Sequence, residues 1–201
     1  MKKLLLAIGL ALVAIPALHA QELTGDDREQ AIKYLEKTRA DVLAATKGLS
    51  EAQWNFKPAT NRWSVAEVTE HIAAAEDFLM DLVHNQVMTA PARGAGEDVK
   101  AIDELVLKAI PDRSVKAQAP EPIQPNNRFG SPAESLKHFE ESRAKTIAFL
   151  KNTKDLRQHA LESPLGKKLD GYEWVLLIAA HSERHTKQIE EVKADPNFPK
   201  K

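Results

Sequence analysis

The sequence contains no cysteine, which excludes disulfide bonds, thiolate metal sites, iron–sulfur clusters and a cysteine nucleophile. Any metal site must therefore be built from histidine, aspartate or glutamate side chains. A charge excess of one sign is also missing, because 28 basic and 29 acidic side chains leave a formal net charge of -1. This balance gives no electrostatic footprint for nucleic acid or for an anionic membrane surface. Aromatic residues are scarce at 5%, a composition that favours helices over strands.

Long apolar runs are rare too, and the one that stands out lies at the amino terminus. Two lysines precede this run, which extends from Leu4 to Leu18 and is followed by the small residue Ala20. The pattern predicts a cleavable signal peptide over residues 1–20. The alternative is a retained membrane anchor, which needs about 20 apolar residues and is disfavoured because this run is shorter. We therefore expect a periplasmic or secreted mature chain over residues 21–201, without membrane contact.

The mature chain is long enough for one domain with a full core, and the spacing of its apolar residues is helical. The last three long helices each begin with a serine or aspartate that has a glutamate three residues later, and Gly48 supplies a stop for the first. The four long helices are expected over about 26–47, 64–87, 131–153 and 171–194.

The connection between the second and third long helices, about 88–130, is itself long. It contains a shorter helical stretch over 98–110, and Pro120, Pro122 and Pro125 keep the remainder irregular. Such a connection can return the chain along the bundle, so these two helices are expected to run parallel. The sequence thus predicts an all-α fold, a four-helix bundle with one long crossover that carries a short extra helix.

Histidines break the amphipathic pattern at three inward positions. His181 and His185 share one stripe of the last helix with Trp174 and Ile178, and their i, i+4 spacing lets both ligate one cation. His71 lies on the apolar side of the second long helix. Three inward imidazoles can form a tripod with open coordination positions, as a catalytic divalent Zn, Ni or Fe ion needs. The alternative is a set of hydrogen-bonded core histidines without a metal.

Two familiar metal motifs are missing from the sequence. It contains no His-Glu-x-x-His, so the usual zinc-peptidase reading has no general-base glutamate. It contains no Glu-x-x-His either, which argues against a carboxylate-bridged di-iron centre.

Arg143 is the other residue that breaks the apolar pattern. It falls between Phe139 and Ile147 on the inward stripe of the third long helix. An arginine in a wet cleft is a candidate substrate-binding residue that clamps a carboxylate or phosphate. The alternative is that its stem packs in the core while its head pairs with a carboxylate of the bundle.

Two segments also carry a family resemblance. The first half contains Gly48-Leu-Ser-Glu, Trp54 and Asn61-Arg-Trp-Ser-Val-Ala-Glu-Val followed by His71, and the last helix contains the pattern H-x-x-x-H-x-x-Q-I from His181 to Ile189. Together these segments resemble the DinB-like family over most of residues 25–194. The resemblance implies an up-down-down-up bundle with a divalent metal on His71, His181 and His185. It also implies chemistry similar to that of metal-dependent thiol S-transferases and mycothiol-dependent isomerases, in which the metal activates a low-molecular-weight thiol.

The sequence leaves two classes of function open. The first is an exported transferase or hydrolase whose three-histidine metal activates a thiol or water for attack on a small-molecule substrate. The second is a non-catalytic periplasmic metal-binding or structural helical module. Nucleic acid is not an expected partner of either class, and both a monomer and a homodimer remain open.

Overall fold

The computed structural model of the chain describes residues 22–94 and 96–200. The predicted signal peptide, residues 1–20, lies outside the described residues, so its cleavage stays a prediction. Within the described part, none of the helices combines the length and the apolar character that a membrane span requires.

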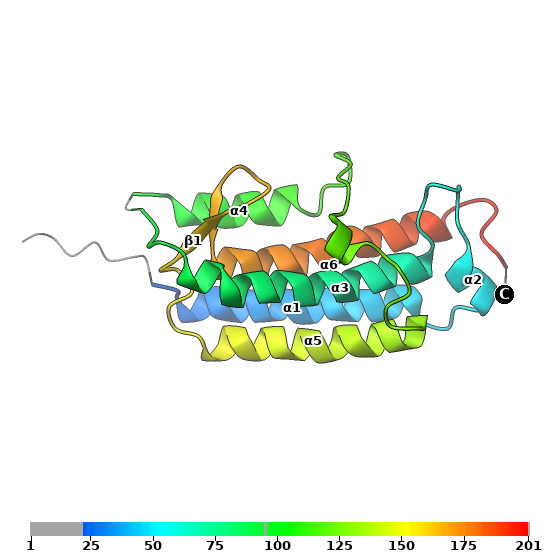
Figure 1. Cartoon of the computed structure of the whole chain (residues 1–201), viewed down its shortest axis with the longest axis horizontal. Coiled ribbons are helices and arrows are strands. Elements are labelled where there is room, and N and C mark those ends of the chain that lie inside the picture. The colour runs from blue at the N-terminus through cyan, green and yellow to red at the C-terminus, as the bar shows by residue number, and fades with distance from the viewer. Residues whose placement is uncertain (1–21, 95, 201) are drawn as a thin grey trace, which may run out of the picture.

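Four long helices form the bundle. They are α1 (Gly25–Thr46), α3 (Val65–Asn85), α5 (Pro132–Asn152) and α6 (Gly171–Lys193). Helices α1 and α6 run in one direction along the bundle, whereas α3 and α5 run in the other (Figure 1). Each of α1 and α3 packs against both α5 and α6. This up-down-down-up arrangement confirms the predicted all-α bundle, and the parallel course of α3 and α5 confirms the need for a crossover.

Side-chain caps fix where the two histidine-bearing helices begin. The Ser64 hydroxyl accepts the Glu67 N–H at 3.2 Å while the Glu67 carboxylate accepts the Ser64 N–H at 2.8 Å. Asp170 and Glu173 form the same reciprocal pair, at 2.9 and 2.7 Å. Each pair satisfies backbone donors that have no partner inside the helix. These starts fix the rotational phase of α3 and α6, and with it the direction in which their histidines point.

The crossover, residues 86–131, returns the chain from the end of α3 to the start of α5. It carries α4 (Val99–Ala109) and two 3₁₀ turns, η1 (Val87–Thr89) and η2 (Glu121–Ile123). Helix α4 begins at its N-cap Asp98 and lies along α6, outside the four-helix core (Figure 1). The predicted short extra helix is confirmed.

The sequence does not predict two short elements. One is the helix α2 (Glu51–Asn55), and the other is a hairpin of β1 (Ala160–Glu162) and β2 (Lys168–Asp170). The strands pair antiparallel, with Ala160 opposite Asp170, and Gly166 in the turn has a φ of 65°. Segments this short contain too few residues to show a period. The hairpin leads directly into α6 and delivers Asp170 to its capping position.

A cluster of buried charges joins the crossover and the hairpin to the start of α6. Arg157 donates to both carboxylate oxygens of Asp103 at 2.8 Å. Asp170 accepts from Arg93 at 2.5 Å and from Arg157 at 3.1 Å. Burial, together with the neighbouring Asp170 carboxylate, raises the pKa of Glu173 to about 7. These charge-assisted bonds hold the first part of the crossover against the bundle.

A second buried ion pair lies at the centre of the bundle. The Arg143 guanidinium is 0% exposed and donates to both carboxylate oxygens of Glu76, each at 2.8 Å. It also donates to the Leu35 carbonyl and to the hydroxyls of Thr38 and Ser182. These bonds use all the donors that a guanidinium has. Arg143 therefore adopts the alternative in which it pairs with a bundle carboxylate, and in this arrangement no N–H is left for a substrate anion.

We expect Arg143→Met to lower the free energy of unfolding by about 3–5 kcal/mol, because the Glu76 carboxylate then stays buried without its partner. The double variant Arg143→Met/Glu76→Leu should recover part of this loss, since it leaves no lone buried charge. Urea denaturation of both variants measures the two values. A single variant as stable as the wild type would show that the pair contributes nothing to the fold.

Candidate metal centre

Three histidines converge between α3 and α6. His71 projects from α3, and His181 and His185 project from successive turns of α6. The Nε2 atom of His71 lies 3.2 Å from Nε2 of His181 and 3.1 Å from Nε2 of His185. The potential ligand atoms of all three residues lie within 4.8 Å of one another. The structure thus brings together the three residues that the sequence singles out as metal ligands.

Hydrogen bonds at the Nδ1 side of two rings fix which nitrogen carries the proton. Nδ1 of His71 lies 2.7 Å from the Ile123 carbonyl oxygen, and Nδ1 of His185 lies 2.8 Å from Oε1 of Gln188. Both partners are acceptors, so Nδ1 is the donor and Nε2 of the neutral ring carries a lone pair. The Nε2 lone pairs of His71 and His185 therefore face each other at 3.1 Å. A cation between them removes this repulsion.

The spacing of the nitrogens fits a divalent metal ion. Imidazole nitrogens bind zinc at about 2.0–2.1 Å, so two ligands of one ion lie roughly 2.8–3.4 Å apart when the angle between them is about 90–110°. The separations of 3.1 and 3.2 Å fall within this range. Among the described residues, the group that could hold a metal consists of these three histidines alone. Three protein ligands leave coordination positions open, as in catalytic rather than structural sites.

Burial keeps the three imidazoles neutral. His71 and His185 are 2% and 8% exposed, and His181 is partly exposed. Burial lowers the pKa of His71 to about 4. Burial, with a further contribution from the neighbouring rings, lowers the pKa of His181 and His185 well below the usual range. Neutral rings are the form that binds metal, so at neutral pH no protons have to leave before a cation binds.

Sequence reasoning does not identify the groups that orient the histidines. The Ile123 acceptor is a backbone carbonyl of the crossover, which leaves no signal in the side-chain pattern. Glu70, next to His71 in α3, accepts the backbone N–H groups of residues 126–128 and so fixes the crossover beside the site. Gln188 is part of the H-x-x-x-H-x-x-Q-I pattern, and this was the one feature of the sequence that could have indicated its role beside His185.

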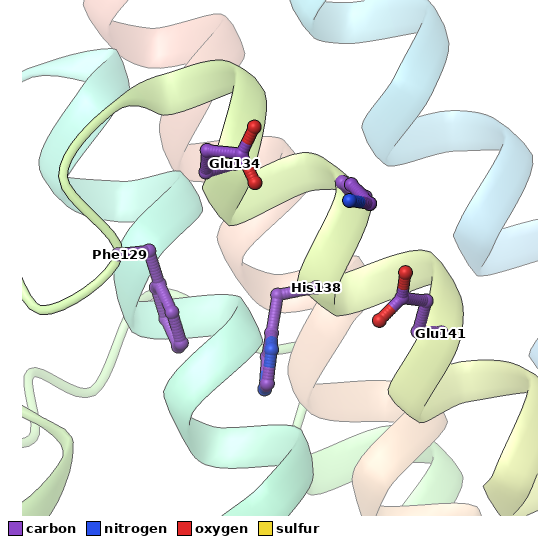
Figure 2. A pocket seen from close by; sticks show the side chains of 5 residues that line it. Phe129, Glu134, His138 and Glu141 are labelled. Atoms are coloured by element: carbon purple, nitrogen blue, oxygen red, sulfur yellow. The ribbon is translucent and has the colours of Figure 1, made fainter.

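The other described histidines lie away from this centre. His138 lies on α5 next to the ring of Phe129, in the shallow surface hollow shown in Figure 2, and bonds to Asp77 at 2.5 Å. His84 is exposed on α3, and His159 bonds to a backbone carbonyl. None of these side chains joins the three-histidine group.

The fold and the site together define a class of protein, namely an up-down-down-up helical bundle with a three-histidine centre between two of its long helices. Comparison with known families agrees with this class, because the sequence model of the DinB superfamily matches residues 34–189. The match spans most of the chain and includes all three histidines, so the chain belongs to the DinB superfamily.

Two proteins of Bacillus subtilis are similar to this chain. YuaE of strain 168, whose name describes it as uncharacterized, is 27% identical over 158 residues, which covers 78% of this chain and 93% of YuaE. The solved structure of YfiT is described as that of "a probable metal-dependent hydrolase with an unusual four-helix bundle topology". It matches with a TM-score of 0.55 and 19% identity, covering 89% of this chain and 93% of YfiT. At this identity the likeness to YfiT supports the fold.

We expect the stability of the metal-free protein to fall as the pH is lowered from about 6.5 toward 4. His71 binds a proton near pH 4 when folded but near pH 6.5 when unfolded, so the unfolded state holds more protons in this window. The part due to His71 is about 3 kcal/mol. Denaturation at several pH values, with a chelator present, should show a shallower dependence for His71→Gln than for the wild type. An equal pH dependence of stability in the two proteins would contradict a lowered pKa for His71.

Proposed function

We propose that this protein binds one divalent metal ion through His71, His181 and His185 and uses it in catalysis, as a hydrolase or transferase that activates water or a thiol. The observation that carries the proposal is the 3.1 Å separation between Nε2 of His71 and Nε2 of His185, because the acceptors at both Nδ1 atoms leave these two nitrogens without a proton. A packed core without a cation would avoid such a contact. Zinc, nickel and iron all suit an imidazole donor set.

The metal ion and the protein side chains would have different roles in the reaction. A divalent ion held by the three imidazoles would supply a Lewis acid, which lowers the pKa of water or of a thiol. His71 and His185 hold their Nε2 atoms toward the centre because their Nδ1 protons are donated to fixed acceptors. The Trp63 ring packs against the imidazole of His71, with 4.8 Å between the two ring centroids. His181 is the most exposed of the three residues, so we infer that a small-molecule substrate would reach the centre from its side.

Water is the activated group that the observations favour. YfiT, which shares the fold, is described as "a probable metal-dependent hydrolase". Export of the chain, which the apolar amino-terminal run predicts, would also separate it from the low-molecular-weight thiols of the cytosol. We therefore place hydrolysis first and thiol transfer second.

A non-catalytic metal-binding module is the second candidate. His71 and His185 are buried, and the crossover is bonded to His71 through Ile123, so a bound ion would also stiffen the bundle. The two candidate functions predict different consequences when the metal is removed. An enzyme loses its activity and keeps its fold, whereas a structural module loses much of its stability.

We also propose that the chain acts in the periplasm or outside the cell. The support is the run from Leu4 to Leu18 behind two lysines. Expression of the full chain in a Gram-negative host, followed by periplasmic extraction and amino-terminal sequencing, should yield a protein that begins near Gln21. An uncleaved chain confined to the cytoplasm would contradict export while leaving the metal site untouched.

His185→Ala should weaken zinc binding by about 100-fold or more and abolish metal-dependent activity, because too few protein donors remain. Its helical content should stay near that of the wild type, since four amphipathic helices bury a continuous core without the metal. The matched control is His84→Ala, which removes an exposed histidine of α3 and should leave zinc binding unchanged. Zinc competition titrations, far-UV circular dichroism and a panel of hydrolase and thiol-transfer assays give the three readouts.

The outcomes separate the candidates. A folded, metal-free His185→Ala protein that is as active as the wild type would exclude the metal-centred mechanism. A variant that loses its metal and unfolds at room temperature would favour the structural module instead.

A further inference from the structure

Gln188 and Arg113 form a hydrogen-bonded chain behind His185, at the Nδ1 side of its ring. Oε1 of Gln188 lies 2.8 Å from Nδ1 of His185. Nη1 of Arg113, which belongs to the crossover, donates to the same oxygen at 3.3 Å. Nε and Nη2 of Arg113 also donate to the two carboxylate oxygens of Glu191, at 2.5 and 2.6 Å. A continuous link therefore runs from the crossover through Gln188 to a residue of the metal centre.

The Gln188 amide has two ends, and only one of them serves His185. Its oxygen accepts a proton, whereas its NH₂ group donates, so an amide rotated by half a turn would place a donor against the Nδ1–H. That arrangement favours the other tautomer, in which Nε2 carries the proton and has no lone pair for a metal. A guanidinium has donors alone and therefore requires the oxygen end. Glu191 holds the guanidinium in place through a bidentate pair.

We propose that Gln188 and Arg113 are positioning residues of the metal centre. Gln188 fixes the tautomer and ring orientation of His185, and Arg113 fixes the orientation of the Gln188 amide. The inference rests on the proposed function. It also gives the crossover a role in the site, because Arg113 acts on His185 through Gln188, and the Ile123 carbonyl accepts directly from His71.

Metal alone serves as the probe of this proposal. Zinc affinity is measured on the full chain by competition with a chelating dye, and the visible absorption of the cobalt-substituted protein reports the coordination geometry. Gln188→Leu removes the acceptor, so it should weaken zinc binding by about 10- to 100-fold and change the cobalt spectrum. Gln188→Glu keeps an acceptor, so it should bind zinc at least as tightly as the wild type and keep the cobalt spectrum. Gln188→Met gives the same test as Gln188→Leu should the latter lose helical content.

Arg113→Ala is tested in two backgrounds. In the wild-type background it should weaken zinc binding by about 5- to 10-fold, because the Gln188 amide becomes free to rotate. In the Gln188→Glu background it should not weaken binding, since the two oxygens of a carboxylate are equivalent. Removal of a positive charge would by itself strengthen cation binding, so a weakening does not come from charge.

Lys187→Ala is the matched control for charge. Lys187 is exposed on α6, pairs with Glu183 and lies next to Gln188 in sequence, so the variant loses one positive charge, as Arg113→Ala does, from the helix that carries Gln188. Its zinc affinity should stay within about two-fold of the wild type, because an exposed pair contributes little.

Each result bears on a separate part of the proposal. Unchanged zinc affinity and cobalt absorption in Gln188→Leu would overturn the role of Gln188. Equal weakening by Arg113→Ala in both backgrounds would overturn the role of Arg113. Both results leave the proposed function standing, because the wild type still binds metal. A wild-type chain that binds neither zinc nor cobalt would overturn the proposed function, and this inference with it.

Discussion

The parallel course of α3 and α5 is the constraint on which the rest of the structure depends. Two packed helices that run in the same direction cannot be joined by a short loop, so the chain must travel the length of the bundle between them. The crossover that does so passes along α6 and then reaches α3 (Figure 1). On the way it brings the Ile123 carbonyl to His71 and Arg113 to Gln188. The segment that the topology requires therefore also orients the candidate ligands.

The bundle buries two kinds of polar group, and they reach electrostatic balance in different ways. Arg143 and Glu76 stay charged, and a bidentate pair together with nearby hydroxyls offsets their loss of hydration. The histidines stay neutral because burial lowers their pKa. The Nδ1 protons of His71 and His185 are donated to the Ile123 carbonyl and to Oε1 of Gln188. What remains is a set of Nε2 atoms that converge on one point, and a cation is the partner that such atoms bind.

The long helices and the three histidines could be predicted because their signals are local. Caps such as Ser64 with Glu67 and the i, i+4 spacing of His181 and His185 depend on residues a turn apart. For Arg143, pairing with a bundle carboxylate was one of the two alternatives, but its partners could not be identified, because they come from three other helices and include a backbone carbonyl. The same holds for the Ile123 acceptor. The hairpin and α2 were missed because they are too short to carry a period.

The central claim is that three imidazoles of one chain bind one divalent metal ion. X-ray absorption spectroscopy of the zinc-loaded protein tests it most directly, because the spectrum reports the number and type of ligands and their distances. The account predicts three imidazole nitrogens at about 2.0–2.1 Å, with the remaining coordination filled by oxygen from solvent. A zinc spectrum without imidazole scattering would contradict it.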